Sequence, residues 1–281
     1  MLIGCQISIA QGLEKALRQA VEVGAQGFQF FTRNPRGSSA RDIGQAEIDG
    51  FTAARSVLVP FPLIAHLPYT VNMMSASADT RSFAAEVVSA DIHRMRSVGV
   101  DALVVHPGSR LSQPKEEALM HLVQVAERHV LPQLGGNTWF LLETMSGSGS
   151  EMGSIKDIGE VISRLGSPGH LGVCLDTCHL FAAGYDLRRK EELGRLLYDL
   201  DRHVGLDRVR CVHINDRKFG PGLQKDRHEK VGEGVIGREG LQNVLITEEY
   251  SHLPFILETP VDNPGGYAKE IAKLRSWISA M

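Results

Sequence analysis

Cysteine is scarce in this chain: 281 residues contain four, at positions 5, 174, 178 and 211. So few thiols do not make the disulfide framework of a small secreted domain. Their spacing does not form two CxxC pairs either, which argues against a structural zinc site. Cys174 shares strand parity with Asp176, and Cys211 shares it with His213. We therefore expect Cys5, Cys174, Cys178 and Cys211 to be small residues packed in the core.

Long apolar runs are absent as well. No segment reaches the roughly 18 apolar residues that a membrane helix needs. The opening "MLIGCQISIAQG" has no basic stretch followed by a long apolar stretch, so it lacks the pattern of a secretory signal. Together these absences predict a cytoplasmic protein with no membrane partner.

A strong charge of either sign is also missing. The formal net charge is −3 at pH 7, so the overall electrostatics do not indicate nucleic-acid binding. If the chain binds DNA, local groups of basic residues must hold it. Such residues follow the predicted strands, at Arg33, Arg36, Arg110, Arg217, Lys218, Lys225, Arg227 and Lys230.

What the sequence does contain is a regular alternation of short apolar segments and longer amphipathic ones. "GLEKALRQAVEVGA" has apolar residues at helical spacing, and glycine follows several such segments, as at Gly24, Gly99 and Gly166. Nearly continuous apolar strands separated by helices indicate a parallel sheet covered on both faces. Eight such units predict one (β/α)8 barrel domain over residues 1–281. The expected strands are 2–7, 27–31, 62–66, 101–106, 138–143, 171–176, 209–213 and 254–258.

Side chains that can bind metals lie at the ends of these strands. Six of the eight predicted strands end in His, Asp or Glu, and three more such residues follow in the loops. The carboxyl ends of barrel strands meet at one face, where active sites lie, so the side chains should converge there. They are His66, His106, Glu143, Asp176, His179, His213, Asp226, His228 and Glu258.

Each of these residues has an ordinary structural explanation when it is taken alone. Asp176 could cap the following helix, His179 could lie on the surface, and "DRH" is typical of a solvated charge run. Together they are harder to explain, because buried carboxylates are costly unless they are paired or metal-bound. A mixed set of imidazoles and carboxylates suits Zn, Mn or Fe better than Mg or Ca. The five histidines favour zinc.

Several motifs resemble the endonuclease IV family, which are zinc-dependent apurinic/apyrimidinic endonucleases of DNA repair. The resemblance extends over essentially the full length and rests on "IGCQISIAQGL", "FQFFTRNPR", "HLPYTVN", "HPGS", "ETMSGSGSEMG", "GVCLDTCHLFAAGYDL", "HINDRKFGPGLQKDRHEKVGEGVIG" and "FILET". It implies a monomeric barrel with three zinc ions that hydrolyses the phosphodiester 5′ to an abasic site in duplex DNA. The products would be a 3′-hydroxyl and a 5′-deoxyribose phosphate.

The same resemblance implies a role for each of the nine residues. Glu143 would bridge the first and second zinc ions, and Glu143 and Glu258 would be the catalytic residues. The other ligands would be His66 and His106 at the first ion, Asp176, His213 and Glu258 at the second, and His179, Asp226 and His228 at the third.

The resemblance also implies which residues touch DNA. Arg36 and Tyr69 would enter the minor groove. Arg227, one of the basic residues of the long loop, is also expected to contact DNA. An abasic nucleotide has no base to unstack, so turning it out of the duplex costs less than turning out a normal one. Specificity would come from the missing base and from the ease of bending the DNA, rather than from reading base edges.

The chain departs from the family pattern at three positions outside the nine ligands. Gln6 stands where the family has His, Ser38 where it has Trp, and Leu223 where it has Ser. These differences concern the DNA-inserting loops and the range of lesions recognised more than the hydrolytic chemistry.

Two other functions share some of these features. Metal-dependent sugar isomerases and epimerases use the same barrel and also gather Glu, Asp and His at strand ends, but they need fewer ligands. Under that hypothesis His179, Asp226 and His228 would be superfluous. A protein that binds damaged DNA or stores metal without turnover would not need the bridging carboxylate of Glu143. Fold alone does not separate these alternatives.

Overall fold

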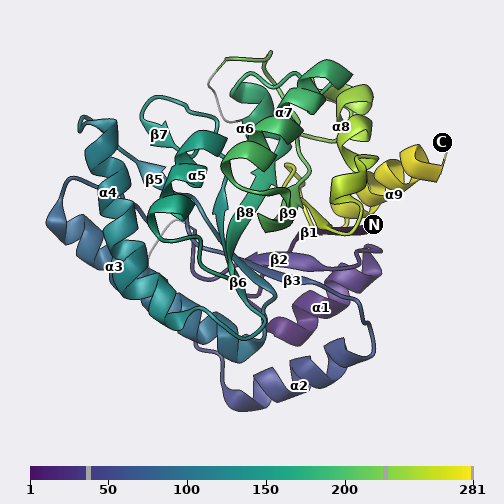
Figure 1. Cartoon of the computed structure of the whole chain (residues 1–281). Coiled ribbons are helices and arrows are strands. Elements are labelled where there is room, and N and C mark those ends of the chain that lie inside the picture. The colour runs from purple at the N-terminus through teal and green to yellow at the C-terminus, as the bar shows by residue number, and fades with distance from the viewer. Residues whose placement is uncertain (36–38, 224–226, 280–281) are drawn as a thin grey trace.

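The computed structural model describes residues 1–35, 39–223 and 227–279. Within these residues, eight parallel strands close into a barrel in the order β1-β12-β9-β8-β6-β4-β3-β2, with helices around it (Figure 1). The predicted barrel is therefore confirmed. The strands are β1 Leu2–Gln6, β2 Phe28–Phe31, β3 Leu63–His66, β4 Ala102–Val105, β6 Trp139–Glu143, β8 Leu171–Asp176, β9 Val209–His213 and β12 Pro254–Leu257.

The barrel strands lie within about one residue of the ranges expected from the sequence. β3, β6, β8 and β9 end on a predicted metal-binding residue, whereas His106 and Glu258 lie one residue beyond β4 and β12. Strands β3, β4 and β8 are buried along their whole length. This burial on both faces explains why they read as nearly continuous apolar runs.

The helices of the described chain cover the outside of the barrel. α1 buries Leu13, Ala16, Leu17 and Ala20 on one face, as its helical spacing predicts. Gly99 ends α3 in the left-handed conformation, with φ of 77°. The helices are α1 Leu13–Glu22, α2 Gln45–Ser56, α3 Ala78–Val98, α4 Lys115–Val125, α5 Ile155–Arg164, α6 Thr177–Ala182, α7 Lys190–His203, α8 Gly237–Leu245 and α9 Gly266–Ser279. None of the described helices is long and apolar enough to span a membrane.

Two small antiparallel two-stranded sheets lie in the loops that follow the barrel strands. β5 (Gly108–Ser109) pairs with β7 (Glu151–Met152), and this pairing connects the loop after β4 to the loop after β6. β10 (Asp216–Arg217) pairs with β11 (His228–Glu229) inside the long connection after β9. The long connection, which the sequence predicts as non-helical, thus returns beside its own start.

The barrel interior below the strand ends is apolar. A compact group of buried side chains fills it, contributed by six strands: Ile64, Ala102, Val104, Leu141, Cys174, Cys211 and Ile256. All four cysteines are buried and none forms a disulfide. A dry, closely packed floor of this kind gives the polar residues above it a rigid support.

Candidate metal centre

Glu143 lies at the centre of the predicted site, at the end of β6, and is 1% exposed. Its Oε2 lies 2.9 Å from His66 Nε2 and 3.3 Å from His106 Nε2. Its Oε1 lies 3.2 Å from His179 Nδ1 and 3.3 Å from His213 Nδ1. Oε2 therefore faces His66 and His106 while Oε1 faces His213, which is the arrangement a carboxylate between two ions needs.

A second group of carboxylates surrounds His213. Its Nδ1 lies 3.2 Å from Glu258 Oε2 and 3.9 Å from Asp176 Oδ2. The Nε2 atom of His228 lies 3.7 Å from the same Asp176 oxygen. The site thus continues from Glu143 through His213 and Asp176 toward the long loop.

Asp176 has two roles in this geometry. It ends β8 and caps α6, because its Oδ1 accepts a hydrogen bond of 2.8 Å from the backbone N–H of His179. Its other oxygen, Oδ2, points to the site and lies near His213 and His228. Asp176 is therefore a helix cap and also lies in the candidate site.

The charges of the site stabilise one another. Burial alone would raise the pKa of Glu143, but the neighbouring His213 and His106 hold it well below its ordinary value. Burial alone would lower the pKa of His213, but Glu258 and Glu143 raise it well above its ordinary value. The histidines therefore favour the negatively charged form of Glu143, which is the form that binds a metal.

The donors fit divalent metal ions of the zinc type. His66, His106 and Glu143 have ligand atoms close enough together to hold one ion, and Glu143, Asp176, His213 and Glu258 could hold a second. The opposite ring nitrogens are held by the protein, as metal-binding histidines usually are. His66 Nδ1 lies 2.6 Å from Leu67 O, and His179 Nδ1 lies 2.9 Å from Thr144 O. Nitrogen and oxygen donors mixed in this way suit Zn, Mn or Fe.

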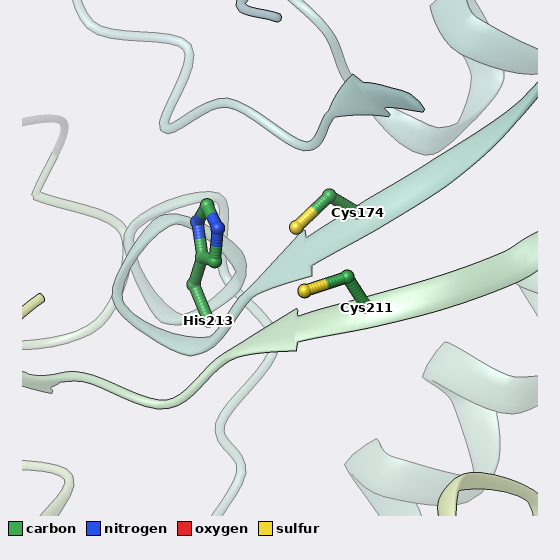
Figure 2. A group of neighbouring side chains, drawn as sticks. All are labelled: Cys174, Cys211 and His213. Atoms are coloured by element: carbon green, nitrogen blue, oxygen red, sulfur yellow. The ribbon is translucent and has the colours of Figure 1, made fainter. Parts of the chain in front are cut away.

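Cys174, Cys211 and His213 form another close group (Figure 2). The two thiols are register partners on β8 and β9, and the His213 ring lies at the end of β9. Burial raises the pKa of the Cys174 thiol well above its ordinary value, so the thiolate that a metal requires is disfavoured. Both cysteines pack within the apolar floor of the barrel, as the sequence predicts.

Two predicted site residues lie outside the described residues: Asp226, expected at the third ion, and Arg36, expected in the minor groove. Ser38, one of the departures from the family pattern, also lies outside them. Tyr69 follows β3 and is 55% exposed. Arg227 is exposed beside β11. Both side chains therefore reach solvent on loops that follow barrel strands.

Two of the basic residues grouped in the sequence make hydrogen bonds or ion pairs within the protein. Arg217 is fully buried, and its guanidinium donates to the carbonyls of Phe219, Gly220 and Leu223. Arg33 donates to the buried carboxylate of Asp91 at 2.9 Å. Burial excludes Arg217 from a basic surface for DNA, and both arginines help to hold their loops in shape.

The long loop is anchored at Asp216, which the sequence did not single out. Its buried carboxylate accepts hydrogen bonds of 2.7–3.2 Å from the backbone N–H groups of Arg217, Gly232, Gly234, Ile236 and Gly237. A Cβ at Gly234 would lie 2.4 Å from both Arg217 O and Asp216 Oδ1, so only glycine fits there. The loop that contains His228 is thereby closed onto one carboxylate.

Two buried amides also touch the predicted ligands and were missed. Asn215 Nδ2 donates to Asp176 Oδ2 at 2.7 Å, and Asn215 Oδ1 accepts from the backbone N–H of Glu258 at 2.9 Å. Gln29 contacts His213 and Glu258 from β2. The sequence did contain a signal for both amides. Gln29 is a polar residue inside the apolar strand "GFQFF", and Asn215 is a polar residue that lies two positions after His213.

Comparisons with known proteins place the chain in a family. A family model described as xylose isomerase-like TIM barrel matches residues 17–277. Probable endonuclease 4 of Moorella thermoacetica is 39% identical over 275 residues, covering 98% of each chain. The corresponding protein of Clostridium botulinum is 40% identical, with the same coverage.

Solved structures show the similarity to endonuclease IV, and they also show that the fold is shared with other enzymes. Endonuclease IV from Thermus thermophilus matches with a TM-score of 0.87 and 32% identity, covering 100% of both chains. A D-tagatose 3-epimerase-like protein matches with a TM-score of 0.67 and 19% identity, covering 100% of this chain and 98% of its own. The second likeness shows the shared fold alone. By sequence and structure, the chain belongs to the xylose isomerase-like TIM barrel family and, within it, to the endonuclease IV family.

Proposed function

We propose that this protein is a metal-dependent DNA-repair endonuclease that hydrolyses the phosphodiester 5′ to abasic sites in duplex DNA. It would leave a 3′-hydroxyl and a 5′-deoxyribose phosphate. The observation that carries the proposal is Glu143, whose Oε2 faces His66 and His106 and whose Oε1 faces His213. The relatives named endonuclease 4 and endonuclease IV support it.

We assign the residues to three zinc ions as the family resemblance implies. Glu143 would bridge the first two, and Mn or Fe would suit the same donors at some sites. When bound, ions of this type make water nucleophilic at neutral pH and stabilise charge on a phosphate and its leaving oxygen. The other ligands are His66 and His106 at the first ion, Asp176, His213 and Glu258 at the second, and His179, Asp226 and His228 at the third.

The protein groups themselves orient the reaction. The side chains of Glu143 and Asp176 are 1% and 0% exposed, whereas that of Glu258 is 15% exposed. Glu258 is therefore the carboxylate that faces the mouth, where a phosphate and a water molecule arrive. We assign catalytic roles to Glu143 as the bridge and to Glu258 as the carboxylate beside the reacting groups.

We further propose that residues 1–281 form one domain that acts as a monomer in the cytoplasm. β1 pairs with β12, so the two ends of the chain build the same barrel beside Glu258. The proposed ligands among the described residues all lie on this barrel or its loops, which supports a site built by a single copy.

Tyr69 offers a test of how the protein holds a lesion. Its ring is 55% exposed, and stacking of an aromatic ring on a base contributes about 1–3 kcal/mol. We expect Tyr69→Ala to weaken binding of abasic duplex by about 5- to 150-fold, measured by fluorescence anisotropy. Tyr198 is 60% exposed on α7, and Tyr198→Ala is the matched control. Equal binding by wild type and Tyr69→Ala would show that this ring does not enter the DNA.

DNA binding should depend steeply on salt, because it rests on phosphate contacts. Each phosphate contact contributes about −0.9 to the slope of log K against log salt. We expect Arg227→Gln to reduce the steepness of that slope by about one unit. The control is Arg128→Gln, which changes an exposed residue that follows α4. An affinity that does not change from low to high salt would contradict the proposed electrostatic contact.

The function itself is tested by incision of a duplex oligonucleotide with one abasic analogue. Products should end in a 3′-hydroxyl that a polymerase extends without further processing. A parallel assay with ketohexoses tests the epimerase alternative. Sugar epimerisation without DNA cleavage would replace the present proposal, and tight DNA binding without cleavage would favour the binding-protein alternative.

A further inference from the structure

Gln29 lies in the middle of β2, is fully buried and is not one of the predicted ligands. Its amide nitrogen donates to Glu258 Oε1 at 2.6 Å and to Gln6 Oε1 at 3.0 Å. Its amide oxygen lies 2.9 Å from His213 Nε2. One side chain thus connects two proposed ligands of the second ion to Gln6, the residue that stands where the family has His.

The orientation of this amide follows from its partners. An ionised carboxylate such as Glu258 can only accept hydrogen bonds, so it requires the NH₂ group of Gln29. The carbonyl oxygen of Gln6 also accepts and takes the second N–H. The Gln29 oxygen must then face His213, so Nε2 of that ring carries the proton and donates. A flipped amide would place two acceptors, Glu258 and Gln6, against the oxygen of Gln29.

The proton on Nε2 has a consequence at the other ring nitrogen. A neutral imidazole with a proton on Nε2 has its lone pair on Nδ1. Nδ1 is the atom that faces the carboxylates of Glu258 and Glu143, at 3.2 and 3.3 Å. The opposite tautomer would point a proton at the place where a metal must bind.

We propose that Gln29, with its amide locked by Gln6, fixes the tautomer of His213 so that Nδ1 is ready to bind a metal. Both glutamines are positioning residues, and this role rests on the proposed metal centre. A plain packing role does not explain them, because burying an amide is costly unless its polar atoms are satisfied and an apolar side chain would fill the same space. A His at position 6 would also offer an acceptor nitrogen to the amide of Gln29.

The test compares wild type with Gln29→Met and Gln6→Met, which keep side-chain length and remove the amide, and with Gln6→His. Gln45→Met on α2 is the control for the chemical change at a solvent-exposed site. Zinc affinity and stoichiometry are measured by competition with a chelator and by mass spectrometry. The tautomer of His213 is read from ¹⁵N spectra of the metal-free, histidine-labelled protein at a pH where the ring is neutral, with assignment by His213→Gln.

We expect Gln29→Met to weaken one zinc site by about 10- to 100-fold and to leave the others near wild type. His213 should lose its single Nε2–H signal. Gln6→Met should weaken the same zinc site to a smaller extent. Gln6→His should have the zinc affinity and the His213 tautomer of the wild-type protein. If Gln29→Met does not fold by circular dichroism, the partly exposed Gln6 variants decide the question.

Wild-type affinity and an unchanged His213 tautomer in Gln29→Met, or in Gln6→Met where the first variant is unfolded, would overturn the proposal. These readouts do not depend on the substrate. A wild-type protein that binds zinc but does not cut abasic DNA would contradict the proposed function and leave the role of Gln29 intact.

Discussion

Glu143→Gln should lose incision of abasic DNA by more than about 100-fold, the upper range for changing a group that merely orients a metal ligand. The amide keeps the shape of the carboxylate but removes the negative charge and one acceptor oxygen. Glu143 faces four imidazoles through two oxygens, so an amide cannot serve both sides as an anion does. Incision rate and bound zinc should therefore fall together.

Two comparisons make this result interpretable. Glu160→Gln makes the same change on α5, where the side chain pairs with Arg164 on the surface, and should leave incision and zinc content unchanged. Thermal unfolding of Glu143→Gln should still be cooperative, because the barrel floor below it is apolar and intact. A Glu143→Gln protein that cuts abasic DNA near the wild-type rate would disprove the bridging role.

Asp216→Ala should disorganise the loop that holds the third proposed ion. Its carboxylate accepts from five backbone N–H groups, between Arg217 and Gly237. Leaving buried donors without a partner costs about 1–3 kcal/mol each, so we expect the free energy of unfolding to fall by at least about 2 kcal/mol. Incision should drop by about 100- to 1000-fold, as when one electrostatic stabiliser of a transition state is lost.

Urea unfolding and incision kinetics measure these two effects. Asp216→Asn keeps one acceptor oxygen and should fall between wild type and Asp216→Ala. Asp201→Ala, on the exposed face of α7, is the control. If Asp216→Ala kept both its stability and its zinc content, the loop would be held by other contacts and the anchoring role would be wrong.

The sequence predicted the parts of this protein that depend on local pattern. The spacing of apolar residues and the glycines that follow the helices predict where the barrel strands lie. In a parallel barrel, the residues at the carboxyl ends of the strands then share one face. For that reason His66 and His213, 147 positions apart along the chain (213 − 66), were expected together, and their rings lie 5.8 Å apart. From the sequence, Asp176 was either a helix cap or a site residue, and the structure shows it in both positions.

The parts that the sequence did not predict depend on contacts between distant residues. The hydrogen bond from Gln29 to Glu258 joins residues 229 positions apart. In the sequence, Gln29 is only one polar residue inside an apolar strand, so its partner cannot be read from the local pattern. Arg217 looked like a surface cation because it lies in a basic stretch. It is buried because the backbone carbonyls of its own loop surround it, and no local pattern reveals such an arrangement.

The most direct test of the metal centre is zinc-edge anomalous diffraction from crystals of the zinc-loaded protein. We predict three peaks per chain at the mouth of the barrel. The first should lie beside His66 and His106, the second between Glu143 and His213, and the third beside His179 and His228. A single peak at the mouth, with His179 and His228 bound to no metal, would contradict the account and return the sugar-epimerase alternative.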